Sequence, residues 1–98
     1  MAQGHQPGQH QHRHRAVYAI SVAADIVGTK VQNLRVYERR GLLEPHRTDG
    51  GTRLYSQHDV DRLTRIVELL DAGVNLAGIA LVLDLEAENA RLREQLTG

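Results

Sequence analysis

Residues 27–55 read V-G-T-K-V-Q-N-L-R-V-Y-E-R-R-G-L-L-E-P-H-R-T-D-G-G-T-R-L-Y, and this stretch decides the fold. It predicts a Gly turn, a short polar and cationic helix that stops at Gly41, and then a basic β-hairpin. Positions 30–53 carry six Lys and Arg against three acids, a net charge of +3 in a chain of formal net charge zero. Since an α-helix fits the major groove and arginines suit phosphates, the pattern predicts a DNA-reading unit.

Two short helices are expected around the first Gly turn. Ser21 is a candidate N-cap for a helix over residues 22–27, Gly28 supplies the turn, and a second helix runs roughly over 31–40. A helix, a Gly turn and a second helix within about 20 residues are typical of a helix-turn-helix. The second of these helices is the expected reader of DNA.

A hairpin and two further helices are expected after this pair. Residues 46–48 and 52–55 are predicted to form strands around an Asp-Gly-Gly turn. Ser56 with Asp59 predicts the start of a third helix, and Asn75 predicts the cap of a fourth. The expected fold class is therefore mainly α with a small β-hairpin wing, a winged helix-turn-helix followed by a short C-terminal coiled-coil helix.

The last part of the chain changes to a heptad pattern. Val82, Asn89 and Leu96 occupy a positions, and Leu85 and Leu92 occupy d positions. This spacing predicts a dimerisation helix, in which a buried Asn lowers stability but fixes the register. Because two heptads make a short helix, which is marginal in water, the strength of the dimer is left open.

The expected organisation has three parts: a His-rich tail over 1–15, the winged helix-turn-helix domain over 16–81 and the dimerisation helix over 82–98. The tail has almost no apolar side chains, so we expect it to be disordered. The chain has no Cys, which excludes disulfides and thiolate metal sites. It shows neither a signal-peptide core nor a membrane-spanning run, so a cytoplasmic location is expected.

The neutral net charge argues mildly against nucleic-acid binding, because such domains are usually basic. The charges are segregated along the chain, however. Residues 84–94 carry four acids against two Arg, opposite in sign to residues 30–53. The positive stretch can therefore attract DNA although the whole chain is neutral.

One face of the predicted second helix carries side chains suited to bases and phosphates. At about 100° per residue, Val31 and Leu34 point to one side and the polar residues to the other. Gln and Asn can pair with adenine, Val can contact a thymine methyl, and cations suit phosphates. The candidate DNA contacts of this helix are Lys30, Gln32, Asn33, Arg35, Val36 and Arg40. An ordinary solvated helix face is the alternative interpretation of the same periodicity.

The predicted wing contributes further candidates. Arg53 and Tyr55 are two residues apart in one strand and so share a face, while Arg47 lies on the neighbouring strand. Either both side chains reach DNA, or Tyr55 packs on the third helix and Arg53 is merely solvated. We favour a division in which Arg53 is functional and Tyr55 is mainly structural, with its hydroxyl offered to a phosphate. Arg47 is the second candidate for a DNA contact.

Three runs together resemble the MerR family of winged-helix regulators: L-R-V-Y-E-R-R-G-L-L-E-P, R-T-D-G-G-T-R-L-Y-S and G-V-N-L-A-G-I. The resemblance covers about residues 18–83. Within the family, I-S-V-A-A near the start and G-V-N-L-A-G-I are most similar to the HspR heat-shock repressor branch. Many members have two successive Tyr where this chain has Val36 and Tyr37, so the resemblance does not extend to a Tyr contact at position 36.

The resemblance implies a homodimer on a palindromic double-stranded DNA operator, with a recognition helix in each major groove and a wing beside it. By motif position it implies DNA contacts for Arg35, Tyr37, Arg53 and Tyr55. It also implies an HspR-like repressor of stress genes with a DnaK-type chaperone as co-repressor. The residues show no catalytic constellation and no cofactor motif, so we expect neither enzyme activity nor a cofactor.

Two other functional classes stay open at this point. A small developmental or excisionase-like MerR-like protein would bind DNA without a stable dimer. A metal- or chaperone-binding module would bind through the tail or the last helix and would lack affinity for DNA. His10, His12 and His14 alternate and could chelate Zn²⁺, Ni²⁺ or Cu²⁺, although a solvated tail is the simpler interpretation.

Overall fold

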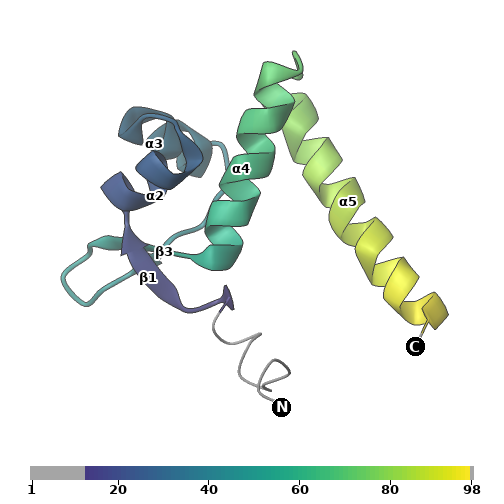
Figure 1. Ribbon diagram of the computed structural model, residues 1–98, viewed down its shortest axis with the longest axis horizontal. Coiled ribbons are helices and arrows are strands. Elements are labelled where there is room, and N and C mark those ends of the chain that lie inside the picture. The colour runs from purple at the N-terminus through teal and green to yellow at the C-terminus, as the bar shows by residue number, and fades with distance from the viewer. Residues whose placement is uncertain (1–12, 98) are drawn as a thin grey trace. The chain divides into compact units, whose positions relative to one another are not determined.

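The computed structural model describes residues 13–97 of the chain (Figure 1). Its elements, in order, are β1 (Ala16–Ala19), α2 (Ile20–Val27), α3 (Val31–Arg39), β2 (His46–Arg47), β3 (Arg53–Ser56), α4 (Gln57–Asp71) and α5 (Leu76–Thr97). They form two compact units that divide within α4, after Val67. Among the described residues, no helix is long and apolar enough to cross a membrane. The arrangement confirms the predicted fold class, a mainly helical winged helix-turn-helix.

The helices α2 and α3 form the predicted helix-turn-helix pair. Ala23 and Ala24 on α2 and Leu34 on α3 are buried. Gly28 ends α2 in the left-handed region, at φ +82°, and its N–H donates to the Ala24 carbonyl at 2.9 Å. The prediction of Ser21 as N-cap is wrong, because β1 runs directly into α2 and the cap position falls on Ala19, which makes no side-chain cap bond.

The wing belongs to a three-stranded antiparallel sheet with the order β1-β3-β2. β2 and β3 form the predicted hairpin, in which Arg47 lies directly opposite Arg53. β1 pairs with the other edge of β3 and places Tyr18 opposite Tyr55. The sequence did not predict β1, because a four-residue strand with an irregular register gives too short an alternating pattern.

A capping box joins the wing directly to α4. Ser56 Oγ accepts a hydrogen bond from the Asp59 N–H at 3.1 Å, and Asp59 Oδ2 accepts one from the Ser56 N–H at 2.9 Å. This reciprocal pair satisfies two backbone donors at the start of the helix and confirms the predicted start of α4. Val60, Leu63 and Ile66 then follow on its buried face, at helical spacing.

The loop after α3 is fixed to α4 before the wing begins. Gly41 leaves the helix in the left-handed region, at φ +76°. Leu42 and Leu43 then turn inward and are buried. Arg62 of α4 donates from Nε to the Leu42 carbonyl at 2.5 Å. These contacts fix the loop between α3 and β2 against α4, and so they fix the position at which the hairpin begins.

The second unit consists of the end of α4 and the whole of α5. The turn between them contains Gly73 at φ +92°. Asn75 Oδ1 then accepts a hydrogen bond from the Gly78 N–H at 2.8 Å, which confirms the predicted cap of the last helix. Ile79 and Leu83 are buried, and α5 continues as one helix through the predicted domain boundary after residue 81.

Candidate nucleic-acid interface

The face of α3 predicted to meet DNA is open to solvent. Gln32, Asn33 and Arg35 are exposed, whereas Leu34 between them is fully buried. A buried leucine anchors the helix while its neighbours remain accessible. The two amides and the guanidinium on this face can therefore enter a DNA groove while Leu34 stays packed in the core.

Cations lie at both ends of α3. Lys30 occupies the N-cap position and Arg40 the C-cap position, and both side chains are exposed. The predicted thymine contact, Val36, is half-buried, so only part of its side chain can meet a methyl group. The ends of the helix therefore supply charge suited to phosphates, and its middle carries the predicted base-reading groups.

The two amides of α3 differ in their availability. Asn33 Nδ2 donates to Thr29 Oγ1 at 2.9 Å, so this amide is already used within the turn. Within residues 13–97, no hydrogen bond engages the Gln32 amide. Gln32 can therefore turn its donor and acceptor freely to an adenine edge, while Asn33 keeps one N–H and its oxygen for a base but is restricted in orientation by Thr29.

A carboxylate near the end of α3 holds both predicted wing arginines. Glu38 Oε1 accepts a hydrogen bond from Arg53 Nε at 2.6 Å, and Oε2 accepts one from Arg47 Nη2 at 2.7 Å. Arg47 Nη1 also donates to the Gly51 carbonyl at 3.2 Å. We call this group of Glu38, Arg47 and Arg53 the Glu38 clamp. It connects α3 to both strands of the wing.

The clamp remains charged at neutral pH. Burial alone would raise the pKa of Glu38, but the hydrogen bonds and charges of Arg53 and Arg47 together bring that pKa below its ordinary value of 4.5. Only 19% of the Glu38 side chain is exposed, so solvent screens these pairs less than pairs at an open surface. The three side chains together carry a net charge of +1.

Sequence reasoning missed the role of Glu38 and counted it only among the acids of the basic stretch. A clue was present in the predicted hairpin, because two arginines on neighbouring strands can come to lie opposite each other. Like charges in this position are destabilising unless an anion lies between them. The structure brings Arg47 and Arg53 into such a pair and places the Glu38 carboxylate within hydrogen-bond distance of both.

The two tyrosines assigned to DNA contact lie in the core. Tyr55 has no exposed surface, and its hydroxyl is also buried. The predicted contact of that hydroxyl with a phosphate is therefore wrong for this conformation, because the ring and its polar end are both covered. Tyr37 keeps only 4% of its surface exposed. A contact through that remainder stays a prediction, and packing accounts for most of its side chain.

Replacing Tyr55 with Phe is expected to raise the free energy of unfolding by roughly 1 kcal/mol, because an unpaired buried polar group is costly. Within residues 13–97, the Tyr55 hydroxyl has no hydrogen-bond partner. DNA affinity should not change. Urea unfolding and DNA titration of the same variant check both statements. Lower stability would indicate that the hydroxyl is paired by water, and weaker DNA binding at unchanged stability would restore it as a DNA contact.

A row of leucines along α5 is open to solvent. Between 45% and 86% of the surface is exposed in each of four residues: Leu81, Leu85, Leu92 and Leu96. Their spacing of four, seven and four places them on one side of the helix. Soluble proteins seldom leave a continuous apolar row uncovered, so this row is a candidate contact surface.

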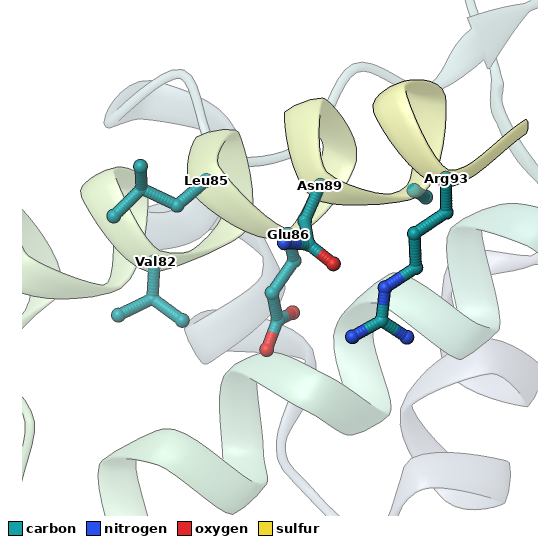
Figure 2. A pocket seen from close by; sticks show the side chains of 6 residues that line it. Val82, Leu85, Glu86, Asn89 and Arg93 are labelled. Carbon is teal, nitrogen blue, oxygen red and sulfur yellow. The ribbon is translucent and has the colours of Figure 1, made fainter. Parts of the chain in front are cut away.

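The remaining predicted dimerisation residues lie beside this row. Figure 2 shows Val82 and Asn89 on α5 with Leu85, Glu86 and Arg93, which line a shallow groove along the helix together with Ala90. Glu86 and Arg93 point to the same side in this view. Apolar side chains flanked by charges of both signs are typical of a coiled-coil seam.

Of the three N-terminal histidines predicted as possible metal ligands, only His14 belongs to the described residues. His10 and His12 lie outside the described residues. The His14 ring lies 4.6 Å from the His58 ring, and Arg13 forms an ion pair with Asp61 at 2.5 Å. Both pairs join the segment before β1 to α4. Among residues 13–97, no group of three or more His, Cys, Asp or Glu is arranged to hold a metal ion.

Several proteins with similar sequences are transcription regulators. HspR of Streptomyces coelicolor, named as a heat shock protein, is 46% identical over 78 residues, which are 79% of this chain and 52% of HspR. GlnR of Bacillus cereus, named as an HTH-type transcriptional regulator, is 36% identical over 86 residues, which are 85% of this chain and 67% of GlnR. The chain thus spans about half the length of HspR.

Solved structures with the same fold agree with these relatives. HiNmlR, a MerR family regulator that lacks the sensor domain and is bound to promoter DNA, superimposes with a TM-score of 0.66 at 26% identity, over 82% of this chain and 67% of HiNmlR. A MerR family regulator from Bacillus cereus gives 0.64 at 27% identity, over 82% and 75% of the two chains. The pattern of the MerR HTH family of regulatory proteins matches residues 18–86. The chain belongs to the MerR family of helix-turn-helix regulatory proteins.

Proposed function

We propose that the protein is a sequence-specific transcription regulator of the HspR type, which represses stress genes by occupying an operator as a homodimer. The observation that best supports sequence-specific DNA binding is the exposed face of α3, with Gln32 and Arg35, beside the cationic wing. The 46% identity to HspR supports the heat-shock assignment over that of GlnR, at 36%. The protein would act in the cytoplasm, where its operator lies.

The proposed contacts divide into base reading and phosphate binding. Gln32, with Asn33 as second candidate, would pair with base edges in the major groove. Lys30, Arg35 and Arg40 would bind phosphates along the groove, together with the free N–H groups at the start of α3. The wing would add a phosphate contact through Arg53.

The proposed dimer would form through α5. Leu85, Leu92 and Leu96 are exposed in the single chain, and their heptad spacing fits the same helix of a second copy. Asn89 in the seam would lower the affinity of the dimer while fixing its register. DNA with two half-sites would then strengthen a weak dimer, because binding at one half-site raises the effective concentration at the other.

A DnaK-type chaperone is the proposed co-repressor. Support for this partner comes from the similarity to HspR alone. Adding the purified chaperone to the protein and its operator should increase operator affinity, while leaving affinity for random DNA unchanged. No change with the chaperone, or a decrease, would exclude it as a co-repressor.

Selection from a pool of random duplex DNA tests the proposed function. We expect an enriched motif made of two inverted half-sites. A single half-site or a direct repeat would favour the excisionase-like alternative without a stable dimer, and the absence of any motif would contradict sequence-specific binding. Genomic fragments retained by the protein should lie next to chaperone genes if the HspR assignment holds, and elsewhere if the GlnR-like similarity is the better guide.

Replacing Arg53 with Ala should weaken binding to operator and random DNA alike. Each phosphate contact that is lost reduces the slope of log affinity against log salt by about 1. Titrations at several salt concentrations, with both kinds of DNA, measure this slope. An unchanged slope with unchanged affinity would show that the wing does not touch DNA.

A further inference from the structure

We propose that Glu38 is a positioning residue for the wing: it aims Arg53 at a DNA phosphate and keeps Arg47 away from the DNA backbone. The inference rests on the proposed DNA-binding function and deepens it, since it gives Arg47 and Arg53 different roles. The sequence alone does not distinguish these two arginines. It also gives an acidic residue a part in DNA binding, although its charge alone would repel phosphates.

Arg53 is held by one edge of its guanidinium. Its Nε donates to Glu38 Oε1 at 2.6 Å, and within residues 13–97 no further hydrogen bond occupies its Nη atoms. The guanidinium is a rigid planar fork with donors on both edges. Because the inner edge is fixed by the carboxylate and 30% of the side chain is exposed, the outer edge is left for a phosphate.

Arg47 is held at both of its terminal nitrogens. Nη2 donates to Glu38 Oε2 at 2.7 Å, and Nη1 donates to the Gly51 carbonyl at 3.2 Å. These bonds use two of the five N–H donors of the guanidinium and tie it to two partners, the carboxylate and the turn, so that it cannot turn freely towards a phosphate. The Arg47 side chain is the more exposed of the two, 46% against 30%, but it is tied at two points whereas Arg53 is tied at one. Arg47 therefore serves to fasten the wing turn to α3, while Arg53 is fixed at Nε and keeps its Nη atoms for a phosphate.

The fixed position of Arg53 should increase the preference of the protein for its operator over random DNA. Phosphate contacts fix the register of a protein on DNA and thereby place its base readers. At the operator, α3 must sit in the groove while Arg53 meets one particular phosphate, so a fixed guanidinium favours that arrangement. On random DNA no fixed register is needed, and a loose arginine can bind any phosphate. Glu38 should therefore increase the ratio of operator to random-DNA affinity.

Three single substitutions separate positioning from charge. Glu38→Gln removes the carboxylate at nearly constant size. Glu38→Asp keeps the charge, but its shorter side chain cannot reach both arginines. Glu44→Gln is the matched control, because Glu44 is exposed in the same basic stretch and forms no ion pair with any residue from 13 to 97. Thermal unfolding of each variant shows whether it is folded before DNA is added.

We expect both Glu38 variants to lower the ratio of operator to random-DNA affinity by roughly tenfold, the effect of losing one charge-assisted hydrogen bond. Glu38→Gln should also steepen the salt dependence on random DNA, because Arg47 is released. Glu44→Gln should raise both affinities alike and leave the ratio unchanged. A ratio in Glu38→Asp equal to that of the unaltered protein would overturn the proposal, since only the charge would then matter.

Arg47→Ala completes the test. This variant should lower the ratio of operator to random-DNA affinity, because the wing is no longer fastened to α3. It should leave the slope of log affinity against log salt unchanged, whereas Arg53→Ala should reduce that slope. A slope reduced by about 1 in Arg47→Ala would make Arg47 a phosphate contact and contradict the inference. If the unaltered protein does not distinguish its selected operator from random DNA, the proposed function fails and the inference fails with it. If it does, and the Glu38 variants behave like Glu44→Gln, only the inference fails.

Discussion

Replacing Leu92 with Asp is expected to lower affinity for a two-half-site operator by roughly 10²- to 10⁴-fold, the range typical of linked binding sites. Leu92 lies in the exposed leucine row of α5 and occupies a d position. In a dimer its side chain would be covered by the second copy, where an unpaired carboxylate is strongly unfavourable. Affinity for a single half-site should change little, because the groups proposed to contact DNA all lie in the first unit.

Ala87→Asp is the matched control for this experiment. Ala87 is also exposed on α5 but lies outside the leucine row, so the variant carries the same added charge in the same helix. Sedimentation should show a monomer for Leu92→Asp and an unchanged dimer for Ala87→Asp. Full two-site affinity in Leu92→Asp would eliminate the coiled-coil dimer and favour a protein that binds DNA repeats as a monomer.

Replacing Gln32 with Ala should relax the base preference at one symmetric position of the operator. A good bidentate pair contributes about 1–3 kcal/mol of discrimination against the wrong base. Because no hydrogen bond within residues 13–97 engages the Gln32 amide, nothing has to be broken before it pairs. Affinity for random DNA should stay nearly constant, since it depends mainly on phosphates.

Asn33→Ala is the informative comparison for Gln32→Ala. Asn33 donates to Thr29 at 2.9 Å, and that bond restricts how the remaining N–H and the oxygen of the amide can be turned towards a base. Its loss should therefore relax specificity less than the loss of Gln32. Selection from random DNA with each variant measures both effects. If both variants return the unaltered motif, the base readers lie elsewhere on α3, with Lys30 and Tyr37 as the next candidates.

The helices were predictable because their determinants are local. The Gly turn at residue 28, the Ser56–Asp59 capping box and the Asn75 cap all act over a few residues, and the structure contains each of them. β1 was missed for the opposite reason. Its partner is β3, almost forty positions later, and nothing in four residues indicates that pairing.

The candidate site was predictable only as a collection of suitable side chains. Periodicity placed Gln32, Asn33 and Arg35 on the outer face of α3, and they are exposed there. The burial of Tyr55 and the pairing of Glu38 with Arg53 depend instead on how α3 and the sheet come together in space. A contact between residues fifteen positions apart leaves no periodic trace in the sequence.

The direct passage from β3 into α4 has a mechanical consequence. β3 ends at Ser56 and α4 begins at Gln57, and the capping box holds the junction from both sides. With no flexible linker between strand and helix, β3 and the part of α4 up to Val67 are joined directly within the first unit. A rotation of this part of α4 would therefore turn β3, and Arg53 at its start, without passing through α3.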